Sequence, residues 1–534
     1  METSSPRNRR LWIPFILFIA YSGLFIWTRQ SEHMMGTAIL FLGAILGLVL
    51  TWVWWTFLSG LRSTSRWLSL VGGIAIIAFL AASLRNEGST SGSGVPRLVW
   101  KWIPTVDQAS QSALSQAPDL ASDVTPETAI APLRFLALDS AEYYGENRNG
   151  VIDGIQIQTK ALDKPLETLW RQPIGLGWSS FAVKGRIAIT QEQRGDEEWV
   201  TAYDLESGHL NWNFTQNRRF IEAMGGDGPR ATPSIHGDTV YALGATGILD
   251  ALRLEDGTRI WSFDVLDGGK SNLVWGKSAS PLFLEEENLV IVTGGKQGGP
   301  TVQAINAEYG EAIWSWGIDA ASYASPIEAT IHGERQLVIV NENTVVGLAP
   351  GSGALLWSHD WPRGMMASSA KAAQPSVIEG SKIFISASYG VGSLLFDITK
   401  AEDGTFGTSL VWHSKNRMKT KFSTATVRGK YAYGLDEGFF ACINIETGKR
   451  IWKDGRYGFG QNLMVNDTAI IQAEDGDIVF VEANPEEFKE IARFPGVEGI
   501  TWNIPTLAGE YLLVRNDKEA ACYRVPVIQI EPSL

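Results

Sequence analysis

Cysteine and histidine are scarce: the 534 residues include two cysteines and six histidines. Neither occurs at a spacing typical of metal ligands, so the sequence predicts no metal site built from them. Cys442 follows Ala441 and precedes Ile443, and Cys522 follows Ala520-Ala521. In such apolar runs an unpaired thiol acts as a small apolar side chain. We therefore expect both cysteines to be free, and a disulfide between them is the less favoured alternative.

Charged residues are also few, at 19% of the chain, and they are unevenly distributed. Residues 1–85 contain no lysine, seven arginines and only two acidic residues, Glu2 and Glu32, which gives a formal charge of +5. The whole chain carries −13, which leaves −18 for residues 86–534. Because nucleic-acid-binding proteins present basic surfaces, this acidic remainder argues against nucleic acid as a partner.

Charge is absent from three apolar runs, at residues 11–28, 35–58 and 67–84. Each is long enough to cross a bilayer as a helix, so residues 1–85 are predicted to form three transmembrane helices in contact with membrane lipid. Arginines precede the first run at positions 7, 9 and 10, and the third run at positions 62 and 66. The positive-inside rule predicts a multi-pass protein of the cytoplasmic membrane, with a cytoplasmic N-terminus and a periplasmic chain after residue 84. A cleaved signal peptide is the alternative for the first run.

Residues 86–132 are rich in glycine, serine, alanine and proline, which is typical of a flexible linker. The run Leu98-Val-Trp-Lys-Trp-Ile interrupts this composition. Its Trp100 and Trp102 have two equally favoured positions, the membrane interface or the underside of the folded domain. The chain therefore divides into membrane helices at 1–85, a linker at 86–132 and a folded domain at 133–534.

The folded domain contains a repeated pattern: a small residue, a glycine six positions later and a tryptophan four positions after that. Five copies fit, at Ala202-Gly208-Trp212, Ala251-Gly257-Trp261, Ala304-Gly310-Trp314, Gly347-Gly353-Trp357 and Cys442-Gly448-Trp452. In residues 238–261 the pattern lies on three short strand-like runs separated by turns. A period of about 40–55 residues made only of strands indicates propeller blades. A β-sandwich is the alternative fold, but it gives no reason for a fixed period.

Eight aromatic residues are expected on the outer strands: Trp170, Trp212, Trp261, Trp314, Trp357, Trp412, Trp452 and Phe494. They define seven intervals along the chain. Strands remain after Phe494, and one outer strand remains unpaired at 168–172. Together they make an eighth blade, so we predict an all-β, eight-bladed β-propeller closed by pairing of its two ends. Each tryptophan is expected to fill the wedge between neighbouring blades.

A small polar residue, often followed by proline, opens the strand of each blade that should line the central channel. Clear examples are Thr232-Pro233, Ser280-Pro281, Ser325-Pro326 and Gln374-Pro375, and looser ones are Ser179-Ser180, Ser423-Thr424, Gln461-Asn462 and Asn503 before Pro505. Proline is acceptable at the first residue of a strand.

This combination of motifs resembles the PQQ-like β-propeller repeat family over residues 140–526. The best copy joins Thr232-Pro233 to Val240-Tyr-Ala-Leu-Gly, then Leu249-x-Ala-Leu and Gly257-x-x-x-Trp. The segments at 145–151, 170–180 and 228–233 are similar to those of membrane-anchored bacterial members. The resemblance implies one of two functions. Some members are dehydrogenases that hold pyrroloquinoline quinone (PQQ) and calcium over the channel, whereas others, such as an outer-membrane-assembly lipoprotein, are scaffolds without a quinone.

The features that the resemblance associates with catalysis are missing from the sequence. No two cysteines are adjacent, no histidine stands at a channel-strand start, and no interval exceeds 55 residues. We therefore expect a membrane-tethered, extracytoplasmic, non-catalytic binding or scaffold module, with no catalytic residue and no cofactor. A PQQ-dependent dehydrogenase of the membrane glucose or alcohol type, with PQQ and calcium, is the alternative. A carbohydrate-binding module is the third interpretation.

One candidate site remains, just before the channel strands. Four of its residues are basic and three are aromatic, and the full set is Arg230, Lys277, Lys371, Lys421, Trp178, Tyr323, Trp502 and Asn503. Because strand starts of a propeller converge on one face, we expect these side chains to surround a central funnel. Converging basic groups suit a carboxylate or phosphate, so the predicted partners are an anionic small molecule or proteins. Scattered surface charge is the alternative interpretation.

Overall fold

The structure, a computed structural model, describes residues 16–17, 19–25, 36–58, 62–90, 95–116, 133, 138–222, 224–267, 271–296, 298–363 and 370–530. The chain forms two compact units. One comprises Met1–Thr105 with Glu222–Gly226, and the other comprises Val106–Ile221 with Asp227–Leu534.

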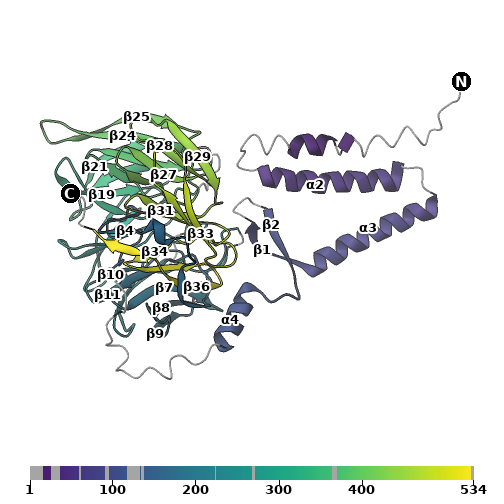
Figure 1. The fold of residues 1–534 in the computed structure, drawn as a ribbon, viewed down its shortest axis with the longest axis horizontal. Coiled ribbons are helices and arrows are strands. Elements are labelled where there is room, and N and C mark those ends of the chain that lie inside the picture. Colours follow the sequence, from purple (N-terminus) through teal and green to yellow (C-terminus); the bar gives the residue numbers. More distant parts are fainter. Residues whose placement is uncertain are drawn as a thin grey trace. The chain divides into compact units, whose positions relative to one another are not determined.

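The N-terminal unit contains two long apolar helices (Figure 1). Helix α2 (Gly36–Val53) continues into a short π-helix, η2 (Trp54–Leu58), and α3 spans Ser63–Ser83. Both are long and apolar enough to cross a membrane, over Ile39–Phe57 and Ser63–Ser83, and they match the second and third predicted spans. The first predicted span, 11–28, lies partly outside the described residues; its residues 16–17 and 19–25 are helical.

The predicted linker, 86–132, contains regular structure in the part that the structure describes. Strands β1 (Leu84–Thr90) and β2 (Val95–Trp100) form an antiparallel hairpin in the N-terminal unit. Helix α4 (Val106–Gln116) belongs to the second unit, where Ser110 Oγ donates to the carbonyl of Ile174 at 2.8 Å. Its Asp107 lies in the first turn, where a carboxylate is favoured by the helix dipole. Residues 117–132 lie outside the described residues, and the role of 86–132 as a linker stays a prediction.

The second unit is an eight-bladed β-propeller (Figure 1), which confirms the predicted fold class. The strands within each blade are antiparallel, and in the first seven blades they run in sequence order from the channel outward. The first four blades contain β6 (Ala182–Lys184), β7 (Ile187–Arg194), β8 (Glu197–Asp204) and β9 (Leu210–Gln216); β10 (Ser234–His236), β11 (Thr239–Leu243), β12 (Ile248–Arg253) and β13 (Arg259–Asp264); β14 (Leu282–Leu284), β15 (Leu289–Thr293), β16 (Val302–Asn306) and β17 (Ala312–Trp316); and β18 (Ile327–Ile331), β19 (Glu334–Val340), β20 (Thr344–Leu348) and β21 (Leu355–Asp360).

The next three blades follow the same order. They contain β22 (Ser376–Ile378), β23 (Lys382–Ala387), β24 (Gly392–Lys400) and β25 (Phe406–Ser414); β26 (Thr426–Arg428), β27 (Tyr431–Asp436), β28 (Phe439–Asn444) and β29 (Arg450–Arg456); and β30 (Gln461–Val465), β31 (Thr468–Gln472), β32 (Ile478–Glu482) and β33 (Glu490–Phe494).

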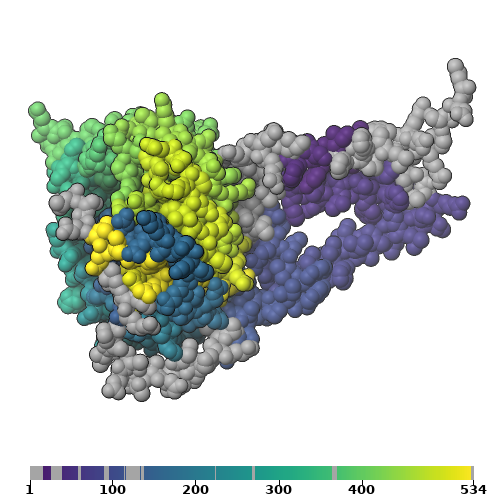
Figure 2. All heavy atoms as spheres, viewed as in Figure 1, coloured from purple at the N-terminus to yellow at the C-terminus, as the bar shows by residue number. Residues whose placement is uncertain are grey.

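The eighth blade joins the two ends of the domain, as the sequence predicted. It contains β34 (Thr506–Ala508), β35 (Tyr511–Arg515) and β36 (Glu519–Arg524), and β36 pairs with β5 (Glu167–Pro173) from the start of the domain. The blue and yellow parts of the surface accordingly lie side by side in Figure 2. Outside the blades, β3 (Val151–Ile152) adds to β30 in parallel, and β4 (Ile155–Ile157), which precedes the 3-10 turn η4 (Thr159–Ala161), pairs with β37 (Val527–Gln529).

The repeated small residue and tryptophan are direct partners across the two outer strands of a blade. Ala251 on β12 pairs with Trp261 on β13, and the other copies pair in the same way: Ala202 with Trp212, Ala304 with Trp314, Gly347 with Trp357, Cys442 with Trp452 and Cys522 with Trp170. A small partner leaves room for the indole ring beside the ladder, because paired side chains on one face lie about 5 Å apart. Both cysteines are buried and free, as predicted.

The repeated glycine receives the tryptophan of the preceding blade. A side chain at Gly257, where φ is +71°, would meet the ring of Trp212 at 2.4 Å, and the indole Nε1 of Trp212 donates to the carbonyl of Leu254 at 2.8 Å. Equivalent bonds run from Trp170, Trp261, Trp314, Trp412 and Trp452. Trp357 differs, because its Nε1 donates to Gln336 Oε1. The predicted filling of the wedge between blades is therefore confirmed.

Candidate functional site

The polar residues that open the channel strands tie each blade to the next. The backbone N–H of Thr232 donates to Ser280 Oγ at 3.0 Å, and the N–H of Ser280 donates to Ser325 Oγ at 2.9 Å. The same bond links Ser180 to Thr232, Ser325 to Gln374 and Gln374 to Thr424. Amide side chains complete the circle, from Gln461 to the carbonyls of Phe422 and Trp502 and from Asn503 to the carbonyl of Ser179. We call these eight residues, Ser180, Thr232, Ser280, Ser325, Gln374, Thr424, Gln461 and Asn503, the polar belt.

A segment that precedes the first blade fills the channel on one side of the polar belt. We call residues 138–152 the plug. Arg148 donates to the carbonyls of Ser280 and Pro281 at 2.9 and 2.8 Å, and Tyr144 donates to the carbonyl of Asn462 at 2.7 Å. β3, at the end of the plug, adds to the sheet of the seventh blade. One segment therefore contacts blades on opposite sides of the ring.

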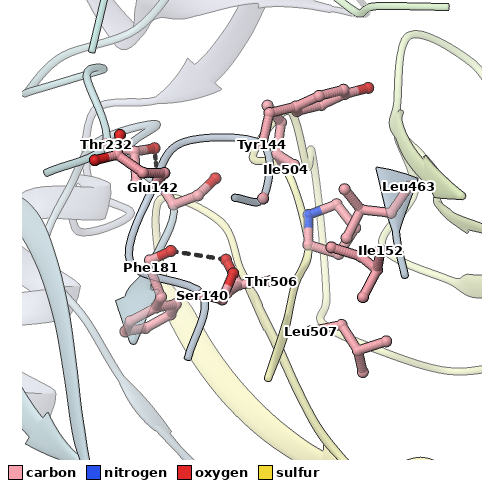
Figure 3. A pocket seen from close by; sticks show the side chains of 13 residues that line it. Ser140, Glu142, Tyr144, Ile152, Phe181, Thr232, Leu463, Ile504, Thr506 and Leu507 are labelled. Carbon is pink, nitrogen blue, oxygen red and sulfur yellow. Dashed lines mark hydrogen bonds between the residues drawn. The ribbon is translucent and has the colours of Figure 1, made fainter. Parts of the chain in front are cut away.

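Charge inside the plug is paired. Glu142 accepts from Arg148 at 2.5 Å and from Ser234 Oγ at 3.1 Å. Burial raises the pKa of Glu142 and lowers that of Arg148, while each partner opposes the shift of the other. A small cavity remains between the plug and the polar belt, with Glu142 and Thr232 on one side and Ile152, Leu463, Ile504 and Leu507 on the other (Figure 3).

Seven of the eight predicted funnel residues precede the belt residue of their channel strand, and the eighth, Asn503, belongs to the belt itself. The rings of Trp178 and Trp502 lie 4.8 Å apart, and Trp502 lies 5.1 Å from Phe422. Phe422 in turn lies 6.0 Å from Phe459. Four aromatic rings from the first, sixth, seventh and eighth blades therefore form a continuous arc, and each is only partly buried.

Other predicted funnel residues contact this arc or one another. Lys421 Nζ lies 4.0 Å from the centroid of Phe459 and 5.8 Å from that of Tyr389. The N–H of Tyr323 donates to the carbonyl of Lys371 at 3.0 Å, and the N–H of Trp178 donates to the carbonyl of Pro229, next to Arg230. We call this surface, formed by the eight predicted residues with Tyr389, Phe422 and Phe459, the funnel face.

The three lysines of the funnel face are buried, which the sequence did not predict. Lys277 is 0% exposed, and its Nζ donates to the carbonyls of Thr293, at 2.5 Å, and Gly294. Burial lowers the pKa of Lys277 to about 7 and that of Lys371 to about 8. Lys371 donates to the carbonyl of Glu342, and burial also lowers the pKa of Lys421. The amino groups of these lysines therefore bind loop carbonyls and aromatic side chains of the propeller.

Arg230 is the one predicted cation of the funnel face that keeps partial exposure. Its Nη1 donates to the carbonyl of Gly228 at 2.7 Å, and its guanidinium lies 5.0 Å from the centroid of Phe220. It is close enough to Tyr323 to oppose the burial that raises the pKa of that phenol to about 12. Arg230 is thus held by Gly228 and Phe220 with part of its side chain exposed.

Carboxylates accompany these cations, and sequence spacing did not reveal them. Glu342 and Asp319 both interact with Lys371, and burial raises the pKa of Glu342. Glu474 accepts from Trp502 Nε1 at 3.0 Å and from the N–H of Phe459 at 3.1 Å. Glu474 lies in the turn between β31 and β32, and its contacts order the funnel face. Only the folded ring brings these groups to the lysines.

The funnel face does not supply an evident set of ligands for calcium beside a quinone. A calcium ion takes six to eight oxygen ligands. Within the described ranges no group of three or more His, Cys, Asp or Glu residues could hold a metal ion. Glu474 is engaged as described above, and Glu437 accepts from Ser388 Oγ. His236 ends the channel strand β10 and stacks on Phe283 with centroids 3.7 Å apart. We derive no catalytic step through PQQ or calcium from these residues.

Comparison with known proteins identifies the family. The model of a family described as outer membrane protein assembly factor BamB matches residues 159–283 and 196–454, which is more than half of the chain. No curated protein matches the sequence. Among solved structures, BamB from Moraxella catarrhalis is similar at 15% identity and a TM-score of 0.48, covering 68% of this chain and 98% of its own.

Two dehydrogenases are also similar in structure. The quinohemoprotein alcohol dehydrogenase from Comamonas testosteroni matches at 11% identity and a TM-score of 0.43, over 80% of this chain and 85% of its own. A europium-containing methanol dehydrogenase matches at 12% identity and a TM-score of 0.41, over 71% and 89%. The repeat pattern, the eight blades and the match of the family model together place the chain in the PQQ-like repeat family of β-propellers that includes BamB.

Proposed function

We propose that this protein is a membrane-anchored, non-catalytic propeller whose funnel face binds a partner outside the cytoplasmic membrane. One observation carries the proposal: the side chains at the channel-strand starts are used to hold the ring together. The polar belt links neighbouring blades, and the three lysines bind carbonyls or aromatic rings of the propeller. Groups with such structural roles are poorly placed to act as acids, bases or ligands, so the funnel face suits recognition.

The membrane anchor is supported by α2 and α3. Arg62 and Arg66 lie at the first end of α3, whereas its other end, Ser83, is followed by the β1–β2 hairpin. The positive-inside rule therefore supports a cytoplasmic start of α3 and a periplasmic propeller. This orientation does not depend on whether residues 11–28 span the membrane. A periplasm-specific reporter fused after residue 132 should be active. Activity of a cytoplasm-specific reporter alone at that position would contradict this orientation.

Two kinds of partner are proposed for the funnel face. The half-buried rings of Trp178, Trp502 and Phe422 offer aromatic area, which is typical of protein-binding surfaces. Arg230 offers the accessible charge for a carboxylate or phosphate of a small molecule or of a partner protein. Binding of a partner protein in an assembly role, such as the one that the name of BamB gives, is one form of this proposal.

Substitution of Arg230 tests the anionic part of the proposal. Citrate and inorganic phosphate are titrated into the full chain in detergent, and binding is followed calorimetrically. Arg230→Ala should weaken binding about tenfold, because hydrogen bonds to charged groups contribute roughly 1.5–3 kcal/mol. Arg253→Ala removes an exposed arginine of the same blade, which pairs with Asp256, and is the matched control. Equal affinities of both variants and the unmodified protein, or no binding of either anion, would contradict it.

A further inference from the structure

The β1–β2 hairpin is joined rigidly to the end of the apolar helix α3. β1 begins at Leu84, directly after the last residue of α3, and the N–H of Leu84 still donates to the carbonyl of Leu80. From the other strand, the N–H of Lys101 donates to the carbonyl of Ser83 at 2.8 Å. Leu84 pairs with Trp100 across the hairpin. Trp100 is therefore held at the level where α3 ends.

An exposed aromatic pair lies on this hairpin. The rings of Trp100 and Trp102 stack 4.7 Å apart with an interplanar angle of 12°. Trp100 also contacts Phe79 of α3, one turn before the helix ends, with centroids 6.3 Å apart. Trp102 is 65% exposed within the protein, and Leu98 and Ile103 are 50% and 45% exposed. We call these four residues, Leu98, Trp100, Trp102 and Ile103, the tryptophan ledge.

Ion pairs and hydrogen bonds of charged side chains hold the two strands of the hairpin together. Arg85 donates to Glu87 and to the carbonyls of Lys101, at 2.9 Å, and Ile103, at 2.6 Å. Arg97 pairs with Glu87 at 3.2 Å. Arg85 thereby holds the segment that follows β2 against β1, so the tryptophan ledge has a defined position beside α3.

We infer that the tryptophan ledge lies in the interfacial layer of the lipid bilayer, at the boundary between headgroups and acyl chains. The lipid is identified by continuity with α3, an apolar helix in which no residue is buried within the protein. A bilayer that covers α3 ends near Ser83, and Trp100 contacts the helix one turn inside that end. Indole rings favour this layer because they combine an apolar body with a polar N–H. The inference rests on the proposed membrane anchor.

The inference adopts one of the two positions that the sequence left open for Trp100 and Trp102, the membrane interface. Both rings belong to the N-terminal unit and contact α3 and each other. The ledge would fix the depth and tilt of α3 in the bilayer, and through the hairpin it would fix the point at which the chain leaves the membrane.

Site-specific labelling tests this position. Both native cysteines are buried, so the introduced cysteine is the single reactive thiol of each variant. Ile103→Cys, Ile74→Cys and Glu255→Cys are labelled with an environment-sensitive dye and reconstituted as full chains in phosphatidylcholine vesicles. Ile74 lies within α3, and Glu255 is an exposed turn residue of the propeller. At position 103 we expect quenching by lipids with a shallow nitroxide, and several-fold weaker quenching by iodide than at position 255.

The outcomes separate the two proposals. Iodide quenching at 103 equal to that at 255, with position 74 protected, would overturn the tryptophan ledge and leave the membrane anchor intact. Water access at both 74 and 103 would overturn the anchor and the ledge together. Trp100→Ala with Trp102→Ala, in the Ile103→Cys background, should raise iodide access at 103 several-fold while 74 stays protected. Unchanged access would show that the indoles do not hold the ledge in the bilayer.

Discussion

Arg515 Nη1 and Thr190 Oγ1 are 325 positions apart in sequence and form a 2.7 Å hydrogen bond. The bond crosses from the eighth blade to the first, at the junction between the two ends of the propeller. Arg515 also donates to the carbonyls of Gln191, at 2.9 Å, and Gly175, at 3.1 Å. Its side chain is 1% exposed, and Glu192 lies close enough to oppose the lowering of its pKa by burial.

Arg515→Met should therefore destabilise the propeller strongly. The substitution leaves several buried acceptors without a donor and removes a charge beside Glu192, so we expect the free energy of unfolding to fall by about 3 kcal/mol. Chemical denaturation followed by tryptophan fluorescence measures the change. Arg524→Met removes a half-exposed arginine from β36 and should cost less than about 1 kcal/mol. Equal losses for the two variants would show that Arg515 does not lock the junction.

The polar belt makes a prediction about an isosteric change. Thr232→Val keeps the shape of the side chain but removes the acceptor for the N–H of Ser180, at 3.1 Å. An unsatisfied buried donor costs roughly 1–3 kcal/mol, and we expect a loss of that size in the free energy of unfolding. Thr215→Val on the exposed outer strand β9 is the control and should be nearly neutral. A neutral Thr232→Val would mean that the belt adds little to cohesion between blades.

Glu198 predicts a dependence of stability on pH. It lies on β8 and accepts from the N–H of Ala245 in the next blade, at 3.0 Å. Burial raises the pKa of Glu198 from its ordinary value to about 7. The folded state therefore holds the proton more tightly, and this contribution to stability is lost as pH rises from about 4.5 to 7.

Glu198→Gln should remove that part of the slope. The difference in free energy of unfolding between the variant and the unmodified protein should shift by about 3 kcal/mol in favour of the variant between pH 5 and pH 8. Glu255→Gln, in an exposed turn, should show no such shift. Parallel stability curves for Glu198→Gln and the unmodified protein would contradict the raised pKa.

The cysteines predict a simple titration with a thiol reagent. Cys442 and Cys522 are 0% exposed, and burial raises the pKa of Cys442 to about 12, so neither should react in the folded protein at pH 8. After unfolding without a reductant, two thiols per chain should react. A count of zero would reveal a disulfide.

The number of blades was predictable from sequence because the repeat is enforced by contacts between neighbours. Trp212 must pack on the glycine at 257, where a side chain would collide with its ring. A fixed spacing of tryptophan and glycine therefore reports a physical constraint of the closed ring. The same reasoning predicted the eighth blade, because the strands after Phe494 lacked an outer strand and β5 lacked a blade.

The state of the funnel lysines was not predictable from spacing. Their order relative to the channel strands predicts a common face, but it does not reveal their partners, which come from hairpins and loops elsewhere in the blades. Lys277 binds the carbonyls of Thr293 and Gly294, and Lys371 meets Glu342 and Asp319. The contacts of the plug were likewise not predictable from spacing, because Arg148 and Tyr144 reach blades on opposite sides of the channel.

Reconstitution with the quinone tests most directly whether the protein is a binding propeller without catalytic activity. The purified full chain is titrated with PQQ in the presence of calcium, and absorbance and reduction of an artificial electron acceptor are recorded with glucose and with a panel of alcohols. A PQQ dehydrogenase apoenzyme, reconstituted in parallel, is the positive control. We predict no saturable quinone binding and no acceptor reduction above the protein-free rate. Saturable binding together with substrate-dependent turnover would contradict the proposal and establish the dehydrogenase alternative.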